Sequence, residues 1–139
     1  MAGSDLTTVM AIAGSGLRAQ SQRMKVVAEN IANAQTTPSK PGEMPYQRKV
    51  VSFKSEFDRA LGVYKVKVDG VRADKSEFIK KFDPSNPAAD EKGYVLTPNV
   101  KPLLEGMDMR QAQHSYNANL SVIESSRSML LKTIDLLRN

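Results

Sequence analysis

A chain of 139 residues is long enough for one ordinary domain and too short for two of average size. Its 40% hydrophobic and 25% charged residues exclude wholesale disorder, and the absence of cysteine excludes disulfides, a thiolate nucleophile and cysteine-ligated zinc. The formal charge of +5 does not indicate a nucleic-acid surface, because the cations between residues 40 and 92 are interleaved with acids and form no run longer than a pair.

The first predicted element is a long helix over residues 5–35. Its residues recur at alternating intervals of four and three, which lines them along one face and is typical of a coiled-coil-like contact with another helix. At about 1.5 Å per residue the helix would be about 45 Å long, too long to be hidden inside a domain of this size. Gly14 and Gly16 weaken its first half, since each costs about 1 kcal/mol relative to alanine. The stripe consists of Leu6, Met10, Ala13, Leu17, Gln20, Met24, Val27, Ile31 and Ala34.

The middle of the chain has a different character. Three prolines between residues 38 and 45 end the first helix, because proline cannot continue the helical hydrogen bonding. Residues 46–53 and 63–71 favour β-strands, and the second of these alternates apolar with charged residues. Residues 82–100 contain further prolines and a glycine, which predicts a turn-rich return.

The last predicted element is a helix that repeats the four-three spacing to the end of the chain. Gln113 and Arg127 are polar insertions, which cost stability in such a stripe but can fix its register or face another partner. Two stripes of similar length can pair with each other. The second stripe consists of Met109, Gln113, Tyr116, Leu120, Ile123, Arg127, Leu130, Ile134 and Leu137.

These elements predict a mainly α fold. We expect residues 1–36 and 103–139 to form one structural unit, an antiparallel coiled coil of long N- and C-terminal helices, with residues 37–102 as a small β-rich, loop-rich central insert. The periodicity alone is also compatible with an amphipathic hairpin that closes on its own core. The middle is too small to cover both helices, however, so we expect apolar surface to remain for neighbouring molecules.

We therefore predict that the apolar stripe residues form contacts between the two helices and between subunits. These residues are Leu6, Met10, Leu17, Met24, Val27, Ile31, Tyr116, Leu120, Ile123, Leu130, Ile134 and Leu137.

No residue pattern indicates catalysis. His114 is the only histidine, and no serine or carboxylate is spaced to form a triad or a metal motif with it. Asp83, Asp90 and Glu91 lack the spacing of an EF-hand, and residues 14–16 lack the ending of a phosphate loop. We expect no catalytic, cofactor or metal site; the alternatives are a basic nucleic-acid-binding module and a small enzyme acting on the cell wall.

The end of the first helix carries a specific motif. Residues 15–36, centred on Asn-Ile-Ala-Asn-Ala at 30–34, resemble the N-terminal signature of the axial proteins of the bacterial flagellar rod and hook. Residues 45–49, 83–95 and 98–100 narrow the resemblance to the proximal rod, and residues 105–119 are similar to the family's second signature. The signature residues are Asn30, Ile31, Ala32, Asn33, Pro98, Asn99, Tyr116 and Asn119.

The resemblance implies a structural, non-enzymatic subunit of the proximal rod of the flagellar basal body, required for motility. Such a subunit would assemble helically, transmit torque and form part of the export channel. The implied partners are copies of itself, other flagellar rod proteins, the membrane-ring and rod-adapter proteins and the export apparatus, with no nucleic acid, no cofactor, no metal and no membrane insertion. The implied location is the periplasmic rod, reached by type III export; no cleavable signal peptide is visible at the start of the chain.

Overall fold

The computed structural model describes residues 2–139, so that Met1, the first residue of the expected N-terminal segment, lies outside the described residues. The order of elements is helix α1 (Ala2–Ala32), strands β1 (Lys49–Asp58), β2 (Val63–Ala73), β3 (Ile79–Phe82) and β4 (Tyr94–Thr97), and helix α2 (Pro102–Arg138). The predicted fold class, mainly α with long terminal helices and a small β insert, is confirmed.

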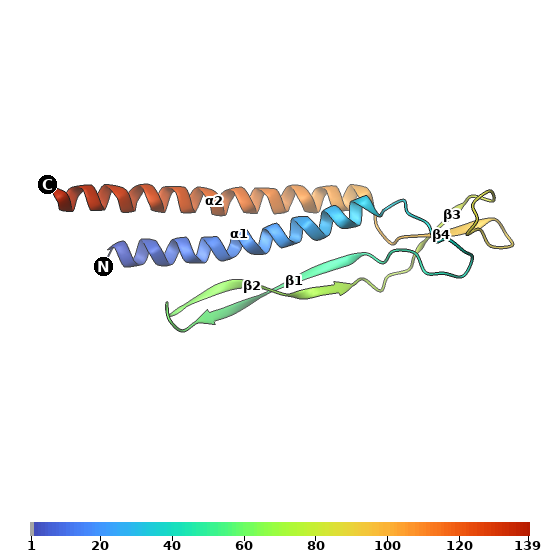
Figure 1. Ribbon diagram of the computed structural model, residues 1–139, viewed down its shortest axis with the longest axis horizontal. Coiled ribbons are helices and arrows are strands. Elements are labelled where there is room, and N and C mark those ends of the chain that lie inside the picture. The colour runs from blue at the N-terminus through green and yellow to red at the C-terminus, as the bar shows by residue number, and fades with distance from the viewer. Residues whose placement is uncertain (1) are drawn as a thin grey trace.

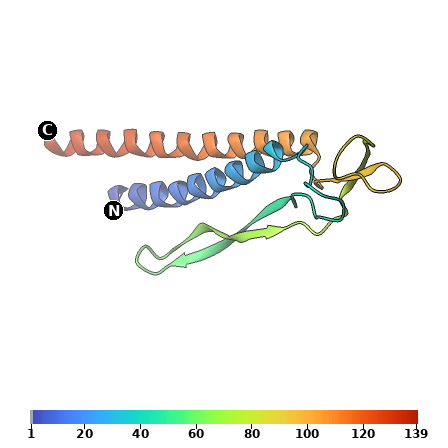
Figure 2. The same ribbon diagram turned by 45° about the vertical axis from the view of Figure 1, so that its right-hand side comes forward.

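The molecule is elongated and layered (Figure 1). Helix α1 lies between α2 and the β1–β2 hairpin, and α2 runs antiparallel to α1 (Figures 1 and 2). The β3–β4 sheet lies beyond the end at which α1 finishes and α2 starts, and both chain termini lie at the opposite end. Within residues 2–139 neither helix has an apolar stretch long enough to cross a bilayer.

Small side chains form the centre of the contact between α1 and α2. Ala13 and Ala112 are buried, and Gly16 lies so close to α2 that a Cβ at this position would be 2.8 Å from Nδ2 of Asn119. Ser126, further along α2, is also buried. Because the distance between helix axes depends on the side chains at the contact, these residues allow the two helices to approach closely.

The stripe of α2 that faces α1 differs in part from the stripe predicted by hydrophobicity. The residues at 109, 116, 123 and 130 are half-buried as expected. At positions 113, 120, 127 and 134, the residue just before the predicted one faces α1 instead. Ala112, Asn119 and Ser126 thus take the places expected for residues 113, 120 and 127, which are exposed. The buried and half-buried positions at four-three spacing are Glu105, Met109, Ala112, Tyr116, Asn119, Ile123, Ser126, Leu130 and Thr133.

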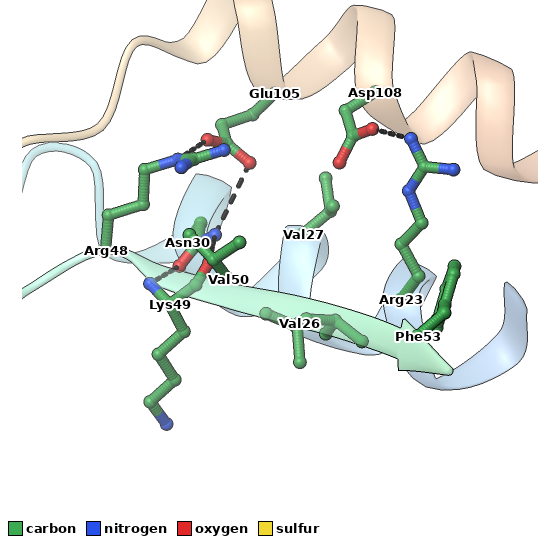
Figure 3. Close-up of a pocket in the computed structure, with 11 residues that line it drawn as sticks. Arg23, Val26, Val27, Asn30, Arg48, Lys49, Val50, Phe53, Glu105 and Asp108 are labelled. Atoms are coloured by element: carbon green, nitrogen blue, oxygen red, sulfur yellow. Dashed lines mark hydrogen bonds and ion pairs between the residues drawn. The ribbon is translucent and has the colours of Figure 1, made fainter. Parts of the chain in front are cut away.

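Helix α1 is buried on two sides. Ala13, Gly16 and Val27 belong to the side that faces α2, whereas Ala19 and Val26 belong to the side that faces the hairpin. Figure 3 shows Val27 pointing toward α2 and Val26 lying against β1. The single apolar stripe read from the sequence therefore describes only one of its two contacts.

Strands β1 and β2 pair antiparallel from Lys49–Ala73 to Asp58–Val63, so β1 runs five residues beyond the predicted strand end at residue 53. A four-residue turn joins them, in which Gly62 has a φ of 69° and the Asp58 carboxylate accepts hydrogen bonds from two backbone amides. A bulge at Val51–Phe53 lies opposite Gly70, whose φ of 115° favours glycine.

A second small sheet, which the sequence did not predict, joins β3, just before the predicted turn-rich return, to β4 within it. Strands β3 and β4 pair antiparallel, and their aromatic residues Phe82 and Tyr94 meet edge to face with ring centroids 5.4 Å apart. Val95 is buried on the opposite side of β4, and Gly93, with a φ of 84°, turns the chain into that strand. This sheet leads directly into the buried segment that precedes α2.

The polar junction and the candidate assembly surfaces

Polar residues from separate parts of the chain meet where α1 ends and α2 begins (Figure 3). Asn30, near the end of α1, is only 1% exposed. Its Oδ1 accepts hydrogen bonds from the backbone N–H of Lys49 at 2.9 Å and from the hydroxyl of Tyr46 at 2.8 Å, and its Nδ2 donates to the carbonyl oxygen of Lys49 at 2.8 Å. The amide side chain therefore pairs with both backbone groups of Lys49, as a neighbouring strand would, and fixes the start of β1 against α1.

Glu105, in the first turn of α2, is equally buried at 1% exposure. Its carboxylate accepts hydrogen bonds from Nε of Arg48 and, at 3.4 Å, from Nδ2 of Asn30. Nη1 of Arg48 also contacts Oδ2 of Asp74 at 3.1 Å. A carboxylate in the first turn is favoured by the helix dipole, and here it also places α2 against α1 and the start of the hairpin.

Asn99 closes the network from the segment before α2. Its Oδ1 accepts from the backbone N–H of Arg48 at 2.7 Å, and its Nδ2 donates to the carbonyl oxygens of Asp74 and Ser76 at 3.0 and 3.2 Å. We call Asn30, Arg48, Asp74, Asn99 and Glu105 the polar junction. It joins α1, the residues that flank the start of β1 and the end of β2, and the start of α2. Within residues 2–139 no buried side-chain N or O atom lacks a hydrogen-bond partner.

The ionisation of the polar junction reflects these contacts. Burial alone would lower the pKa of the Arg48 guanidinium, but its hydrogen bonds and charge contacts with Glu105 and Asp74 raise it overall. The pKa of Asp74 is lowered, chiefly by hydrogen bonds from the backbone and hydroxyl of Ser76 and further by Arg48. Burial raises the pKa of the Tyr46 hydroxyl, which donates to Asn30. The folded state thus favours the charged Arg48–Asp74 pair and the neutral tyrosine.

A pocket of about 390 Å³ lies beside the polar junction, between α1, β1 and the start of α2 (Figure 3). Val26, Val27 and Phe53 supply its apolar lining. On its rim Nη2 of Arg23 contacts the carboxylate of Asp108 and donates to Oε1 of Gln111 at 3.0 Å. The charges of the pocket are arranged in pairs that hold elements together, and within residues 2–139 no group of three His, Asp or Glu side chains is placed to bind a metal.

Comparison with known proteins shows where this chain belongs. Residues 10–38 match the family described as "Flagella basal body rod protein", and residues 91–136 match "Flagellar basal body rod FlgEFG protein C-terminal". The "Flagellar basal-body rod protein FlgC" of Agrobacterium fabrum is 50% identical over 133 residues, which cover 96% of each chain. The chain belongs to the FlgC family of flagellar basal-body rod proteins.

Other FlgC proteins resemble the chain over a similar length. The FlgC of Escherichia coli O6:H1 is 40% identical over 94% of this chain and 97% of its own, and that of Bacillus subtilis is 36% identical over 90% and 93%. The resemblance read from the sequence is confirmed, and the chain is a structural protein of the flagellar basal-body rod.

The FlgC-family signature residues gather at the polar junction and along α2. Asn30 and Asn99 are members of the polar junction, and Pro98 is buried next to Asn99. Asn33, the residue after α1, donates through its side chain to the carbonyl oxygen of Glu29 at 2.9 Å, whereas Ile31 and Ala32 are exposed. Tyr116 and Asn119 are half-buried on α2.

The predicted interface residues divide by burial. Val27 is buried, and seven others are half-buried: Leu6, Met10, Leu17, Met24, Tyr116, Ile123 and Leu130. Four are exposed in the single chain: Ile31, Leu120, Ile134 and Leu137. Their contacts with neighbouring subunits stay a prediction.

Sequence reasoning missed part of the exposed apolar surface and most of the polar junction. Leu103 and Leu136 are each 79% exposed at opposite ends of α2, and Met107, Met129 and Leu131 are also exposed. Their signal was present in the sequence as apolar residues that fall outside the predicted α2 stripe. Arg48, Asp74 and Glu105 left no comparable signal, because their partners lie tens of residues away.

Proposed function

We propose that this FlgC-family chain is a subunit of the proximal rod that assembles helically with copies of itself and with other rod proteins. In this role it transmits torque and forms part of the export channel, and it catalyses no reaction. The observation that carries the proposal is the apolar surface of α2, which extends over more sides of the helix than α1 covers.

Two flanks of α2 expose apolar residues on either side of its contact with α1. One flank carries Val122 and Met129, and the other carries Leu120, Leu131 and Ile134. Helical spacing places these two sets on different sides of the helix. Because α1 covers only one side of α2, each flank is available to a helix of an adjacent subunit. The predicted interface residues Leu120, Ile134, Leu137 and Ile31 would become buried in those contacts.

The side of α2 turned away from α1 is polar. Between residues 110 and 128 it carries exposed polar residues at three- and four-residue spacing: Arg110, His114, Asn117, Ser121, Glu124, Ser125 and Ser128. In a ring of subunits joined through the two flanks, this polar side would face a common axis. A water-filled passage lined by hydroxyl and amide groups would give exported chains little apolar surface to which they could adhere, which supports a place in the export channel.

The polar junction supports a mechanical role. It connects both helices and the hairpin through buried hydrogen bonds and a buried carboxylate, so these elements are held in one fixed arrangement. Heterologous contacts that do not close on themselves generate open helical assemblies, which is the geometry a drive shaft requires. Through such contacts a rigid subunit would pass rotation to the next one.

The proposed location is the periplasmic part of the basal body, reached by flagellar type III export. The proposed neighbours are other rod proteins, the membrane-ring and rod-adapter proteins and the export apparatus. Membership of the FlgC family supports this placement.

The flanks can be tested one at a time in cells that lack their own copy of the gene. Leu131→Glu combined with Ile134→Glu changes one flank, and Val122→Glu combined with Met129→Glu changes the other. All four residues are exposed, so the free energy of unfolding of each purified variant should differ from that of the wild type by no more than about 0.5 kcal/mol. We expect loss of swimming and no rod in purified basal bodies.

Leu131→Met with Ile134→Val is the matched control, because it keeps the flank apolar, and it should swim normally. Normal swimming with both glutamate pairs would refute the proposal. For the export channel, Ser121→Trp should reduce the amount of axial protein released into the medium, whereas Ser121→Ala should not.

A further inference from the structure

Asn119 is a FlgC-family signature residue that lies outside the polar junction. It is half-buried in the middle of α2. Its Nδ2 donates to the carbonyl oxygen of Ser115 at 3.0 Å, one turn earlier in the same helix, and this bond fixes the orientation of the flat carboxamide. Because the bond stays within α2, it does not explain why an asparagine lies on the side of the helix that faces α1.

Gly16 of α1 provides the space that this carboxamide fills. A Cβ at residue 16 would lie 2.8 Å from Nδ2, 2.9 Å from Oδ1 and 3.0 Å from Cγ of Asn119. These distances are well inside the optimal separation of about 3.5–4.0 Å for non-bonded heavy atoms. The amide could make room for a Cβ only by turning away from Ser115, so the glycine and the asparagine fit each other in this orientation. We call the contact between Gly16 and Asn119 the helix seat.

Hydrophobic burial alone would place α1 on a different side of α2. The line of residues that faces α1 includes Ala112, Asn119 and Ser126, whereas the line one residue further on includes Leu120 and Ile134, which remain exposed. Turning α2 by about 100°, the angle of one residue, would bury leucine in place of asparagine and remove more apolar surface from water. The observed contact therefore follows the shape of the two helix surfaces rather than their hydrophobicity.

The polar junction and the Arg23–Asp108 pair hold α2 against α1 only near the start of α2. Glu105 and Asn119 are two heptads apart, which is about 21 Å along the helix. A straight helix drifts by about 20° per heptad relative to a heptad repeat, so over this distance the line that faces α1 would turn away by about 40°. The helix seat lies where this drift has accumulated, and it provides a second fixed point between the two helices.

We propose that Asn119 and Gly16 are specificity-determining residues: in the assembled rod, the carboxamide of Asn119 seated on Gly16 selects the side of α2 on which α1 packs. The same contact keeps the two apolar flanks of α2 turned away from α1. That the flanks then meet neighbouring subunits rests on the proposed function, whereas the selection of the helix side rests only on contacts within one chain.

Two neighbouring glycines of α1 give a matched test in cells that lack their own copy of the gene. Alanine favours a helix at both positions, so helix propensity alone predicts that Gly14→Ala and Gly16→Ala are both tolerated. A Cβ at residue 14 would meet only Nη1 of Arg18 at 3.7 Å, so Gly14→Ala is the control and should swim normally. We expect Gly16→Ala to lose swimming and to leave no rod in purified basal bodies. Adding Asn119→Ala to Gly16→Ala removes the clashing amide and should restore both.

The side of α2 that faces α1 can be read directly, because the chain contains no cysteine of its own. A Cβ at Gly3 would lie 3.6 Å from Cδ1 of Leu130, so Gly3→Cys with Leu130→Cys should form an intrachain disulfide in purified basal bodies. Leu131 is exposed on the next line of α2, so Gly3→Cys with Leu131→Cys should form little. Asn119→Ala removes the helix seat without creating a clash, and we expect it to shift the disulfide from residue 130 toward residue 131. A non-reducing gel separates these intrachain disulfides from links between subunits.

Three results would each overturn the proposal: normal swimming of Gly16→Ala, failure of Asn119→Ala to restore it, or an unchanged ratio of the two disulfides in Asn119→Ala. These results are separate from those of the flank variants. If the glutamate pairs on both flanks swim normally, the proposed function fails, whereas the disulfide ratio still reports the helix seat within one chain.

Discussion

Replacing Glu105 with glutamine should strongly destabilise the chain, although the two side chains have nearly the same shape. The substitution removes the negative charge that Arg48 contacts inside the polar junction and leaves the guanidinium with Asp74 alone. Removing one partner of a buried ion pair costs about 3–5 kcal/mol. Because the Arg48 side chain keeps 28% exposure, we expect the lower end, about 3 kcal/mol.

Urea unfolding of the purified chain, followed by circular dichroism, measures this loss. With a slope of about 2 kcal/mol per molar urea, the midpoint should fall by about 1.5 M. Glu56→Gln is the matched control, because Glu56 pairs with Lys67 at 3.0 Å on the exposed face of the hairpin. Exposed pairs contribute little, so its midpoint should change by less than about 0.3 M.

A combined Arg48→Met and Glu105→Leu variant separates the charge from the packing. It should be more stable than Glu105→Gln alone, because neither charge of the broken pair remains in the polar junction. Equal midpoints for Glu105→Gln and Glu56→Gln would refute the view that the buried carboxylate holds the two helices and the hairpin together.

Three further substitutions test other parts of the structure. Asn30→Ala should cost about 2–4 kcal/mol in urea unfolding, since it leaves the Lys49 N–H, the Lys49 carbonyl oxygen and the Tyr46 hydroxyl without their partner. Gly106→Ala should gain about 0.5–1 kcal/mol in thermal unfolding, because its Cβ would meet open space, whereas Gly16→Ala should lose stability against Asn119. Asp74→Asn should reduce the amount by which acid lowers the free energy of unfolding. The pKa of Asp74 in the folded chain lies below its ordinary 3.8, so the Asp74 carboxylate stabilises the fold above that pH, and this stabilisation is lost as pH falls through the folded pKa.

Each of these has a contradicting result. If Asn30→Ala were as stable as the wild type, water would have to replace the amide. If Gly16→Ala and Gly106→Ala had equal effects, the contact between α1 and α2 at Gly16 would be looser than described. If the free energy of unfolding of Asp74→Asn fell as much as that of the wild type between about pH 5 and about pH 2, the lowered pKa would be contradicted.

The sequence predicts the two helices well because their apolar residues repeat over many turns. It predicts the helix contact less well, since Ala112, Asn119 and Ser126 carry no hydrophobic signal, and Leu120 and Ile134 draw the expected stripe one position away from Asn119 and Thr133. The second side of α1 was missed for the same reason, as Ser15 and Ala19 do not read as a packing surface.

The polar junction shows a different limit of sequence reasoning. Asn30 and Asn99 were singled out only through the family resemblance, and their physical role became visible when the fold brought distant backbone groups to them. Glu105 lies in the first turn of the last helix, where the helix dipole favours a carboxylate, but its pairing with Arg48 spans 57 positions and no local periodicity encodes it. Strands β1 and β2 were expected from composition, whereas β3 and β4 were not expected, and the bulge at Gly70 depends on the register of the partner strand.

The contact between Asn30 and Glu105 joins residues 75 positions apart at the closed end of the molecule, while both termini lie at the open end. The entropy of closing a long loop is thus lost once, at this contact. From there each further turn of α1 and α2 can zip toward the termini without closing another loop, so the last turns form last and open first. A chain built in this way can fray or extend at its ends while its centre stays folded.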